Sequence, residues 1–446
     1  MSLERWPKVA ALREKLNGKA KAEPGFRFYL LYDKMYRMDV LQAAYALCRK
    51  NGGAPGVDGV TFEQIEAQGA ERFLGELARE LKSRTYESNA VRRVMIPKPG
   101  KPGEFRPLGI PTIKDRVVQQ AAKLLLEPIF EADLPENAYG YRAGKSAHDA
   151  VQSVMRGLKA GYQDVVDADL SKYFDTIPHD QLMQAVERRI VDHKMLALIR
   201  GWLKAPVHVE DERTGKTRIE GGQATKAGTP QGGVISPLLA NIYFRRVLVA
   251  WKQFGYDRKY RSRIVNYADD FVILTQGKAS AALDAARAVL VRIGLTLNEK
   301  KTRICKAPDE EFSFVGFTFG KQYTLEGKAY LGMAVSRKKL QQHRARLRMM
   351  TGSSQTQQSA EHLTKKMLPV IRGFWNYFSI GARAQALGTM ERYVFARVRR
   401  WLKRKHPKGG RWSEQLANIW PDFEATFKRA RARKHGLATA GSPRTA

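Results

Sequence analysis

The stretch that decides the fold carries two adjacent acids between two apolar runs, Ile264-Val265-Asn266-Tyr267-Ala268-Asp269-Asp270-Phe271-Val272-Ile273-Leu274. Both runs are rich in β-branched and aromatic residues, which favour strands. The sequence therefore predicts a hairpin that turns at Ala268, Asp269 and Asp270 and holds two carboxylates at its tip. Aspartate is also common in ordinary turns, so a purely structural reading of this tetrapeptide stays open.

A second acid-bearing strand is predicted upstream, at Asp164-Val165-Val166-Asp167-Ala168-Asp169-Leu170. Side chains alternate along a strand, so Asp167 and Asp169 share one face. If Asp169 and Asp269 come together, their carboxylates repel each other unless cations lie between them. Mg²⁺ suits such a place because it prefers a few carboxylates, waters and substrate phosphates. Two Mg²⁺ ions could activate a primer 3′-hydroxyl and stabilise a pyrophosphate leaving group.

Composition points to a globular protein that binds a polyanion. The 446 residues are 43% hydrophobic, enough for two or three domains, and 78 Lys and Arg against 44 Asp and Glu give a formal charge of +34. Nucleic acid is the first candidate partner and an anionic membrane surface the second. We find no apolar run that would span a bilayer and no signal peptide. Two distant cysteines, Cys48 and Cys305, suggest a reducing compartment, so we expect a cytoplasmic protein associated with the nucleoid or with a ribonucleoprotein.

Basic residues upstream of the two acid-bearing strands suggest a nucleotide site. Strands at Val91–Pro97 and Phe105–Pro111 would form a hairpin that brings Lys98, Lys101 and Arg106 together. These side chains could clamp a triphosphate, or they could be a solvated basic turn.

Residues in three further segments bear on the same site: the segment from Phe174 to His179, the pair Lys300 and Lys301, and the loop Ala227–Pro237. Phe174, just past the Asp169 strand, could press on the sugar and exclude a 2′-hydroxyl. Lys300 or Lys301 could protonate pyrophosphate. His179 fits a structural or capping role better than that of a base. The Gly- and Pro-rich loop Ala227–Pro237 exposes backbone, which would let a flat ligand approach; a plain loop-to-helix join is the alternative.

Periodicity also predicts the surrounding elements. Thr61 and Ser146 are expected to cap helices. A strand is expected at Phe312–Phe319, and Pro369 is expected to open a helix. Other helices are predicted at residues 8–16, 28–49, 113–130, 238–250, 281–293 and 394–405, helical segments over 180–203, and a hairpin at 207–220. From Ser336 the chain is helical and strongly basic with interleaved aromatics, as in nucleic-acid surfaces. The tail after Arg433 is expected to be disordered.

The order of these motifs resembles that of group II intron-encoded reverse transcriptases, also called maturases. The resemblance runs from roughly Asp39 to Trp412. It rests on the Asp169 strand and on Gly-Ala-Pro-Gly-Val-Asp-Gly at 53–59, Arg-Pro-Leu-Gly-Ile-Pro at 106–111, Tyr-Gly-Tyr-Arg at 139–142, Gly-Thr-Pro-Gln-Gly-Gly at 228–233, Tyr-Ala-Asp-Asp at 267–270, Leu-Asn-Glu-Lys-Lys-Thr at 297–302 and Phe-Val-Gly-Phe at 314–317.

The resemblance implies an α+β right-hand polymerase with fingers, palm and thumb. The expected parts are a basic lead (1–25), fingers and palm (26–330), a helical basic thumb or maturase domain (331–406) and a basic extension that binds DNA or RNA (407–446). It also implies an RNA-directed DNA polymerase that binds intron RNA, an RNA template, a DNA primer or target DNA, and dNTPs. No membrane partner is expected, and the oligomeric state stays open.

The resemblance assigns roles to single residues. The catalytic acids would be Asp169, Asp269 and Asp270. Asp169, Asp269 and the Leu170 carbonyl would bind two Mg²⁺ ions. The incoming nucleotide would meet Lys98, Arg106, Gln231, Lys301 and the steric gate Phe174. The primer grip would be Phe314, Val315, Gly316 and Phe317. Contacts to RNA would come from the thumb, through Arg337, Lys338, Arg344, Arg348, Arg372, Arg400, Lys403 and Arg404.

Two departures from the family pattern affect this reading. Phe374 stands where the thumb signature Arg-Gly-Trp-x-Asn-Tyr-Phe has tryptophan, an apolar exchange that preserves packing. No Cys- and His-bearing endonuclease segment follows the thumb, so we expect no nicking of target DNA. Two alternatives remain: a splicing cofactor with an idle polymerase site, and a free-standing reverse transcriptase used in phage defence or DNA repair.

Overall fold

The computed structural model describes residues 3–98, 103–210, 217–324, 326–408 and 410–432. Its chain forms two compact units. The first comprises Met1–Ala150 and Ala168–Arg303, and the second comprises Val151–Asp167 and Ile304–Ala446. The boundary therefore crosses strand β3 (Asp164–Asp169) and leaves Asp169 in the first unit. The tail after Arg433 lies outside the described residues.

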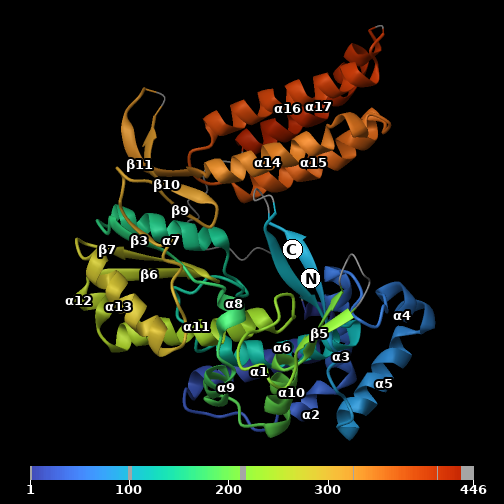
Figure 1. Ribbon diagram of the computed structural model, residues 1–446, viewed down its shortest axis with the longest axis vertical. Coiled ribbons are helices and arrows are strands. Elements are labelled where there is room, and N and C mark those ends of the chain that lie inside the picture. The colour runs from blue at the N-terminus through green and yellow to red at the C-terminus, as the bar shows by residue number, and fades with distance from the viewer. Residues whose placement is uncertain (1–2, 99–102, 211–216, 325, 409, 433–446) are drawn as a thin grey trace. The chain divides into compact units, whose positions relative to one another are not determined.

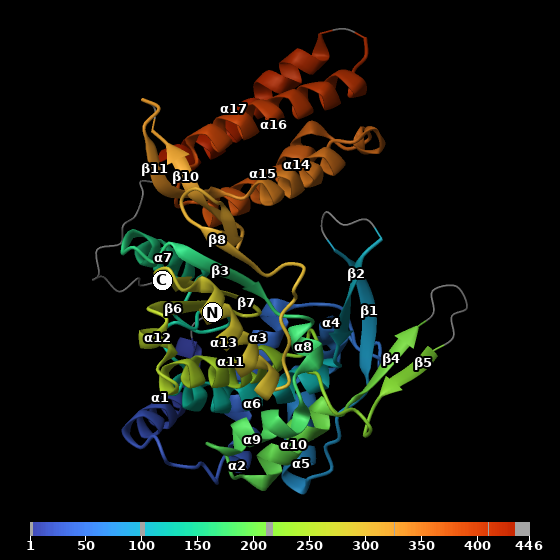
Figure 2. The same ribbon diagram turned by 60° about the vertical axis from the view of Figure 1, so that its left-hand side comes forward.

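Two long helices, α6 (Ile113–Glu131) and α11 (Ser236–Gln253), form the centre of the first unit (Figures 1 and 2). Val117, Val118 and Ala121 of α6 are fully buried, so the periodicity that predicted this helix is confirmed. The other described helices of this unit are α1 (Pro7–Ala22), α2 (Tyr32–Met35), α3 (Met38–Asn51), α4 (Phe62–Gln68), α5 (Ala70–Ser83), α8 (Tyr173–Thr176), α9 (His179–Glu187), α10 (His193–Leu203), α12 (Tyr256–Lys259) and α13 (Ala279–Arg292). Helix α7 (Ala147–Lys159) begins in this unit.

A four-stranded sheet in this unit has the strand order β2-β1-β4-β5 (Figure 2). Strands β1 (Val91–Pro97) and β2 (Phe105–Ile110) pair antiparallel, as do β4 (Pro206–Glu210) and β5 (Thr217–Gly221), while β1 and β4 run parallel. Both predicted hairpins are confirmed. A separate hairpin, β6 (Ser262–Tyr267) and β7 (Asp270–Thr275), lies beside the end of β3.

The second unit contains a three-stranded antiparallel sheet and a bundle of four helices. The sheet order is β11-β10-β9, formed by β9 (Phe312–Phe314), β10 (Phe317–Tyr323) and β11 (Ala329–Val335), and β8 (Arg303–Lys306) precedes it in the chain. The bundle consists of α14 (Arg337–Met350), α15 (Ala360–Tyr377), α16 (Ala384–Lys405) and α17 (Arg411–Ala432), which lie side by side in Figures 1 and 2. Large buried side chains, among them Trp375, Trp401 and Phe423, fill the bundle core.

The prediction of one strand over Phe312–Phe319 is wrong. The chain turns back at Val315 and Gly316, whose φ angles are +51° and +84°. Phe314 and Phe317 then face each other as the first pair of β9 and β10. Two residues, Val315 and Gly316, separate Phe314 from Phe317, so the aromatic alternation shifts by one position at the turn, and the prediction overlooked this shift.

Two predicted helix boundaries are also wrong. The segment 28–49 holds two helices, because Arg37 adopts an extended conformation (ψ 133°) and its guanidinium bonds Asp39 at the start of α3. Pro369 lies inside α15 and does not open it. The helix continues past this proline because buried residues on both sides of it, Met367 and Ile371, extend one apolar face. Helix α17 was not predicted.

Candidate active site

The turn that carries Asp269 is short and closely confined. Tyr267 and Asp270 are the last pair of β6 and β7, so Ala268 and Asp269 form the turn, and Ala268 has a φ of +59°. The next four residues of β7, Phe271–Leu274, are buried. Asp269 is half-buried and Asp270 is exposed. The predicted hairpin is therefore confirmed, and it presents two carboxylates at its tip.

Neighbouring residues hold this turn from two sides. The buried Asn266 donates its side-chain amide to the Ala268 carbonyl at 2.8 Å. Gly140 packs so tightly against Ala268 that a Cβ at position 140 would overlap the Ala268 backbone nitrogen. The buried Asn241 donates to the Gly140 carbonyl at 2.8 Å. These contacts fix the backbone on both sides of Asp269, which sequence reasoning did not foresee.

Asp169 ends β3, which adjoins β7 in the sheet. The Lys301 ammonium lies 2.7 Å from its Oδ2, and the Asn298 side-chain amide donates to the same oxygen at 3.2 Å. The Asn298 backbone N–H donates to the Asp169 carbonyl at 2.8 Å. Leu170 follows and forms a bridge with Leu297. The Leu-Asn-Glu-Lys-Lys-Thr motif is thereby joined to the Asp169 strand.

Aromatic side chains connect the two acid-bearing segments. Phe174 lies in α8 with its ring 6.3 Å from that of Tyr141 and 5.7 Å from that of Tyr173, both edge-on. Burial raises the pKa of the Tyr141 hydroxyl, and the negative charge of Asp269 raises it further, while Arg106 opposes this. Tyr141 is thus within electrostatic range of Asp269 and of Arg106, and it is 49% exposed. The Tyr-Gly-Tyr-Arg motif was noted, but the contact of Tyr141 with Phe174 was not predicted.

The Gly-Thr-Pro-Gln-Gly-Gly loop is anchored to the Phe174 segment. The Thr229 N–H donates to the Phe174 carbonyl at 2.7 Å, and the Gln231 amide donates to Asp175 at 3.2 Å. The buried His179 ring bonds the Gly228 carbonyl at 2.7 Å, which agrees with a structural role. Gln231 therefore lies close to the segment that carries Phe174.

The basic hairpin also contacts this loop. The Gly109 N–H of β2 donates to the Gln231 carbonyl at 2.6 Å. Arg106 is exposed and lies opposite Ile96, while the Lys98 N–H bonds the Glu104 carbonyl. Residues opposite each other and two apart share one face of the hairpin, so Lys98 and Arg106 lie on the same face. The Lys98 ammonium pairs with Glu104 at 3.0 Å. Lys101 lies outside the described residues.

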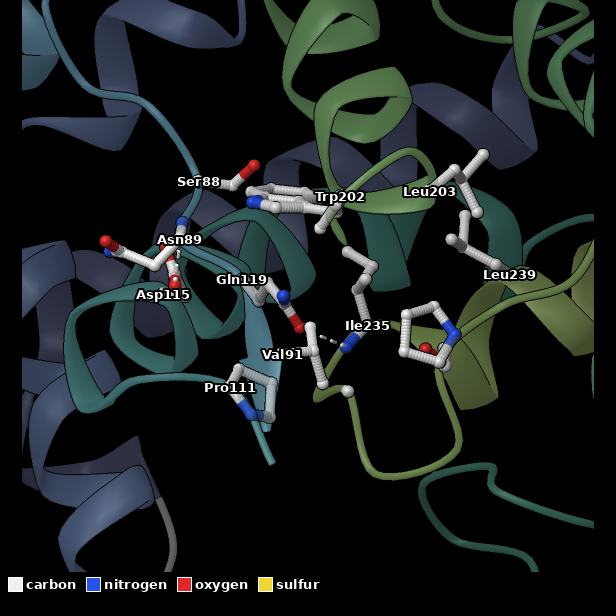
Figure 3. A pocket seen from close by; sticks show the side chains of 14 residues that line it. Ser88, Asn89, Val91, Pro111, Asp115, Gln119, Trp202, Leu203, Ile235 and Leu239 are labelled. Atoms are coloured by element: carbon white, nitrogen blue, oxygen red, sulfur yellow. Dashed lines mark hydrogen bonds between the residues drawn. The ribbon is translucent and has the colours of Figure 1, made fainter. Parts of the chain in front are cut away.

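A small cavity lies behind the Gln231 loop, between α6, α10 and the start of α11 (Figure 3). Its volume is only about 10 Å³. Gln119 projects from α6 and accepts the Val234 N–H at 2.9 Å. On the other side, Tyr86 donates to the buried Asp115 at 2.6 Å. The side chains around this cavity therefore hold the loop in place through packing and hydrogen bonds. Neither Asp169 nor Asp269 lines the cavity.

In the second unit, the predicted primer-grip residues form the tight turn between β9 and β10. The Tyr377 hydroxyl donates to the Val315 carbonyl at 2.9 Å. The Phe317 ring lies 5.0 Å from that of Phe378. The Phe-Val-Gly-Phe motif therefore packs on the end of the thumb signature in α15. Phe374 stacks on the buried His343 of α14 at 4.0 Å, so the aromatic packing role survives the departure from tryptophan.

The eight predicted RNA-binding residues lie on α14, α15 and α16. Seven are exposed: Arg337, Lys338, Arg348, Arg372, Arg400, Lys403 and Arg404. Arg344 is half-buried, with its guanidinium over the Tyr393 ring. The Lys403 ammonium lies over Trp412 of α17 at 4.8 Å. Most of these cations are therefore open to a polyanion.

The described residues contain no group of three or more His, Cys, Asp or Glu side chains placed to hold a metal ion. Mg²⁺ commonly uses only one or two protein carboxylates, so a site with two of them needs no such group. Among the helices of the described ranges, none combines the length and apolar character that crossing a bilayer requires.

Two families of known proteins match parts of this chain. The family described as reverse transcriptase (RNA-dependent DNA polymerase) matches residues 96–319, and the group II intron, maturase-specific domain matches residues 340–420. Protein YkfC of Escherichia coli K12 is 34% identical over 346 residues, which cover 69% of this chain and 87% of YkfC. The group II intron-encoded protein LtrA of Lactococcus lactis is 32% identical over 256 residues, 57% of this chain and 41% of LtrA. The chain thus matches less than half the length of LtrA.

Among solved structures, the apo telomerase from Candida tropicalis has a TM-score of 0.41 at 14% identity, covering 58% of this chain and 60% of that one. The match to the reverse transcriptase family, and not that structural likeness, puts this mixed α+β chain in the class of right-hand nucleic-acid polymerases. Within that class, the chain belongs to the reverse transcriptase family, the RNA-dependent DNA polymerases, and it carries the maturase-specific domain of group II intron proteins. Reverse transcriptases generally use Mg²⁺.

Proposed function

We propose that this chain extends a DNA primer on an RNA template with dNTPs, and that Asp169 and Asp269 are the residues on which the reaction depends. The observation that carries the proposal is the meeting of two motifs at one place. Asp169 ends a strand beside β7, and Tyr141 lies near both Asp269 and Phe174. Residues far apart in sequence thus surround one small region of the first unit.

The surrounding side chains have roles that follow from their chemistry. Arg106 is exposed and can bind a triphosphate through two parallel hydrogen bonds. Gln231 is held against Asp175 and lies beneath the incoming nucleotide. Phe174, supported edge-on by Tyr141 and Tyr173, limits the space at the sugar and so favours a deoxyribose.

The two carboxylates and the Leu170 carbonyl are a suitable donor set for two Mg²⁺ ions. Asp169 Oδ2 already accepts a cationic group, the Lys301 ammonium at 2.7 Å, so its surroundings tolerate positive charge. Bound Mg²⁺ would lower the pKa of the primer 3′-hydroxyl and neutralise charge on the leaving pyrophosphate. Lys301 would leave Asp169 when the metal binds, and its ammonium would then be free to give a proton to pyrophosphate. Asp270 supports the site from the first position of β7.

The maturase-specific domain supports a second part of the proposal, the binding of a group II intron RNA to assist its splicing and mobility. The exposed cations of α14 to α16 would contact the RNA backbone. Because these contacts release counterions, RNA affinity depends steeply on salt. The oligomeric state in which this occurs is left open.

The test is primer extension on an RNA template with dNTPs and Mg²⁺, comparing wild type with Asp269→Asn. We expect the variant to lose activity by about a thousandfold or more, because a neutral amide cannot hold the metal charge. Asp257→Asn, at a half-buried residue of α12, is the matched control and should stay within about twofold of wild type. RNA affinity should be unchanged in both variants. Activity that survives Asp269→Asn would overturn the assignment.

A further inference from the structure

An open cavity of about 270 Å³ lies between α9 and α11, on a part of the first unit that the proposed reaction does not use. The two helices lie near each other and near α6 in both ribbon views (Figures 1 and 2). Its apolar floor is formed by Phe130, Ala185 and Ile242, which are buried. Its volume is slightly below the range of about 300–1,000 Å³ that is usual for ligand pockets. The space suits a small ligand with both a flat and a polar part.

The walls of this cavity are strongly basic. Three arginines, Arg188, Arg245 and Arg246, line it together with one acid, Asp133. The Asp133 carboxylate also faces the buried Arg189, whose Nε lies 3.5 Å away. One carboxylate thus serves more than one guanidinium, so the cavity keeps an excess of positive charge. Like charges held close together repel, and a bound anion relieves that repulsion.

Two of these arginines, Arg245 and Arg246, are held in place by the protein and keep unused N–H donors. Arg245 donates its Nε to the Asp133 carbonyl at 2.8 Å. Arg246 donates one Nη to Gln181 at 2.8 Å, and its guanidinium lies over the Tyr243 ring. Burial lowers the pKa of Arg245, and the nearby charge of Arg188 lowers it further against the opposing effect of Asp133. A guanidinium has five N–H donors, so each keeps several for a ligand.

The third arginine, Arg188, is not held by the protein in this way. Arg188 follows the last residue of α9 and is exposed. Over the described residues, its guanidinium makes no hydrogen bond and no ion pair. Gln184, one turn earlier on the same face, offers an amide that can both donate and accept. Arg188 and Gln184 therefore present polar groups toward the cavity that a ligand could use.

We propose that this cavity binds the phosphate group of a nucleotide, with Arg188, Arg245 and Arg246 as its ligands. Planar guanidinium groups match the oxygens of phosphate, and a partly shielded cluster of three binds it better than isolated surface cations do. The apolar floor accommodates the base, and Gln184 lies where it can bond the base or sugar. The nucleotide can be free in solution or part of an RNA strand, since the phosphate chemistry is the same.

The test uses the full chain in EDTA without primer or template, so that the metal-dependent site does not contribute. AMP is titrated by calorimetry into wild type, Arg188→Glu and Arg79→Glu. Arg79 is an exposed arginine of α5 that serves as the matched charge-reversal control. RNA that carries 8-azidoadenosine is irradiated with the same three proteins, and the cross-linked peptides are mapped. Thermal melting verifies that each variant is folded.

If free nucleotides are the ligand, AMP affinity falls about tenfold or more in Arg188→Glu and stays near wild type in Arg79→Glu. If the nucleotide belongs to RNA, AMP binds too weakly to measure, and cross-links to α9 and α11 appear in wild type and are lost in Arg188→Glu. Both results support the phosphate site. If Arg188→Glu behaves like Arg79→Glu in both arms, the proposal is overturned.

Discussion

Two hairpin turns of this molecule solve the same conformational problem in different ways. The first, Ala268-Asp269 between β6 and β7, carries a carboxylate, and the second, Val315-Gly316 between β9 and β10, carries none. Each begins with a residue in the left-handed region, Ala268 at φ +59° and Val315 at φ +51°. That region disfavours any side chain and disfavours a β-branched one more, so both turns need support from outside.

The supports differ in kind. The first turn is held by buried amides and backbone: Asn266 bonds the Ala268 carbonyl, and Gly140 fills the space behind it. The second turn is held by a helix: Tyr377 of α15 bonds the Val315 carbonyl, and the Phe317 ring packs against Phe378. The first arrangement fixes the Asp269 turn rigidly within the first unit. The second ties the position of the Val315-Gly316 turn to that of helix α15 in the bundle.

This difference fits the roles proposed for the two turns. A carboxylate that holds a metal must be placed within a fraction of an ångström, which buried hydrogen bonds achieve. A grip on a primer strand must move with the strand as it advances, and a link to a helix of the nucleic-acid-binding bundle permits that. The comparison is tested by disturbing each support separately.

The largest effect is expected at Gly140. Gly140→Ala places a methyl group against the Ala268 backbone, so the turn must shift and displace Asp269. We expect primer extension to fall by about a hundredfold, since a displacement of about 1 Å has that effect on catalytic groups. Unfolding free energy should drop by about 1–3 kcal/mol. Both are measured on the purified variant, by extension assay and by chemical denaturation.

Gly75→Ala is the control, because a Cβ at this half-buried position of α5 meets nothing within 4 Å. Alanine is the better helix former there, so stability should rise by up to about 1 kcal/mol without loss of activity. Full activity in Gly140→Ala would show that the turn is not rigidly held, and the contrast between the two turns would fail.

The first turn was predictable from sequence, and its support was not. Two β-branched runs around Asp269 and Asp270 predict the hairpin, and the order of the motifs led us to propose Asp169, Gln231 and Phe174 as site residues. What the sequence left hidden was the contact of Gly140 with Ala268, across more than a hundred residues. Such contacts depend on how separate segments pack, and periodicity describes single elements only.

The second turn was not recognised, because the residues on each side of it alternate as in a strand and the one-residue shift between them was overlooked. Phe312, Phe314, Phe317 and Phe319 are all buried, although one continuous strand would put the first two and the last two on opposite faces; the chain reverses between Phe314 and Phe317. Val315 gave no turn signal, since β-branched residues favour strands. The turn exists because Tyr377 and Phe378, which lie about 60 residues later, stabilise it.

The next effect is a pH dependence confined to the second turn. His343 stacks on Phe374, which packs on Phe378 beneath that turn. Burial, aided by the charge of Arg346, lowers the pKa of His343 from 6.5 to about 4. Between these two pKa values, His343 is protonated in the unfolded chain and neutral in the folded one. The free energy of unfolding therefore falls as the pH falls from about 6.5 to about 4. The loss approaches about 3 kcal/mol for the second unit.

Hydrogen exchange measured at several pH values reads this effect locally, in peptides of residues 312–323 and 262–275. Destabilisation on acidification should appear in the first of these peptides well before the second. His343→Phe keeps the ring stack and removes the titrating group, so it should abolish the difference. Substitution of the exposed His362 by Gln is the control and should leave the difference intact. An unchanged pH profile in His343→Phe would remove the histidine from the explanation.

The smallest effects come from deleting one hydrogen bond at each turn. Asn266→Ala leaves the buried Ala268 carbonyl without its donor, which costs about 1–3 kcal/mol. Tyr377→Phe removes a bond from a side chain that is 37% exposed, where water replaces the hydroxyl, and costs at most about 1 kcal/mol.

Hydrogen exchange should therefore accelerate about tenfold or more in residues 262–275 for Asn266→Ala, and about fivefold or less in residues 312–323 for Tyr377→Phe. Each variant should leave the other turn unchanged, because the supports lie in different units. Equal acceleration by the two variants would mean that both turns are held with the same stiffness, and the proposed division between a fixed metal ligand and a moving grip would lose its physical basis.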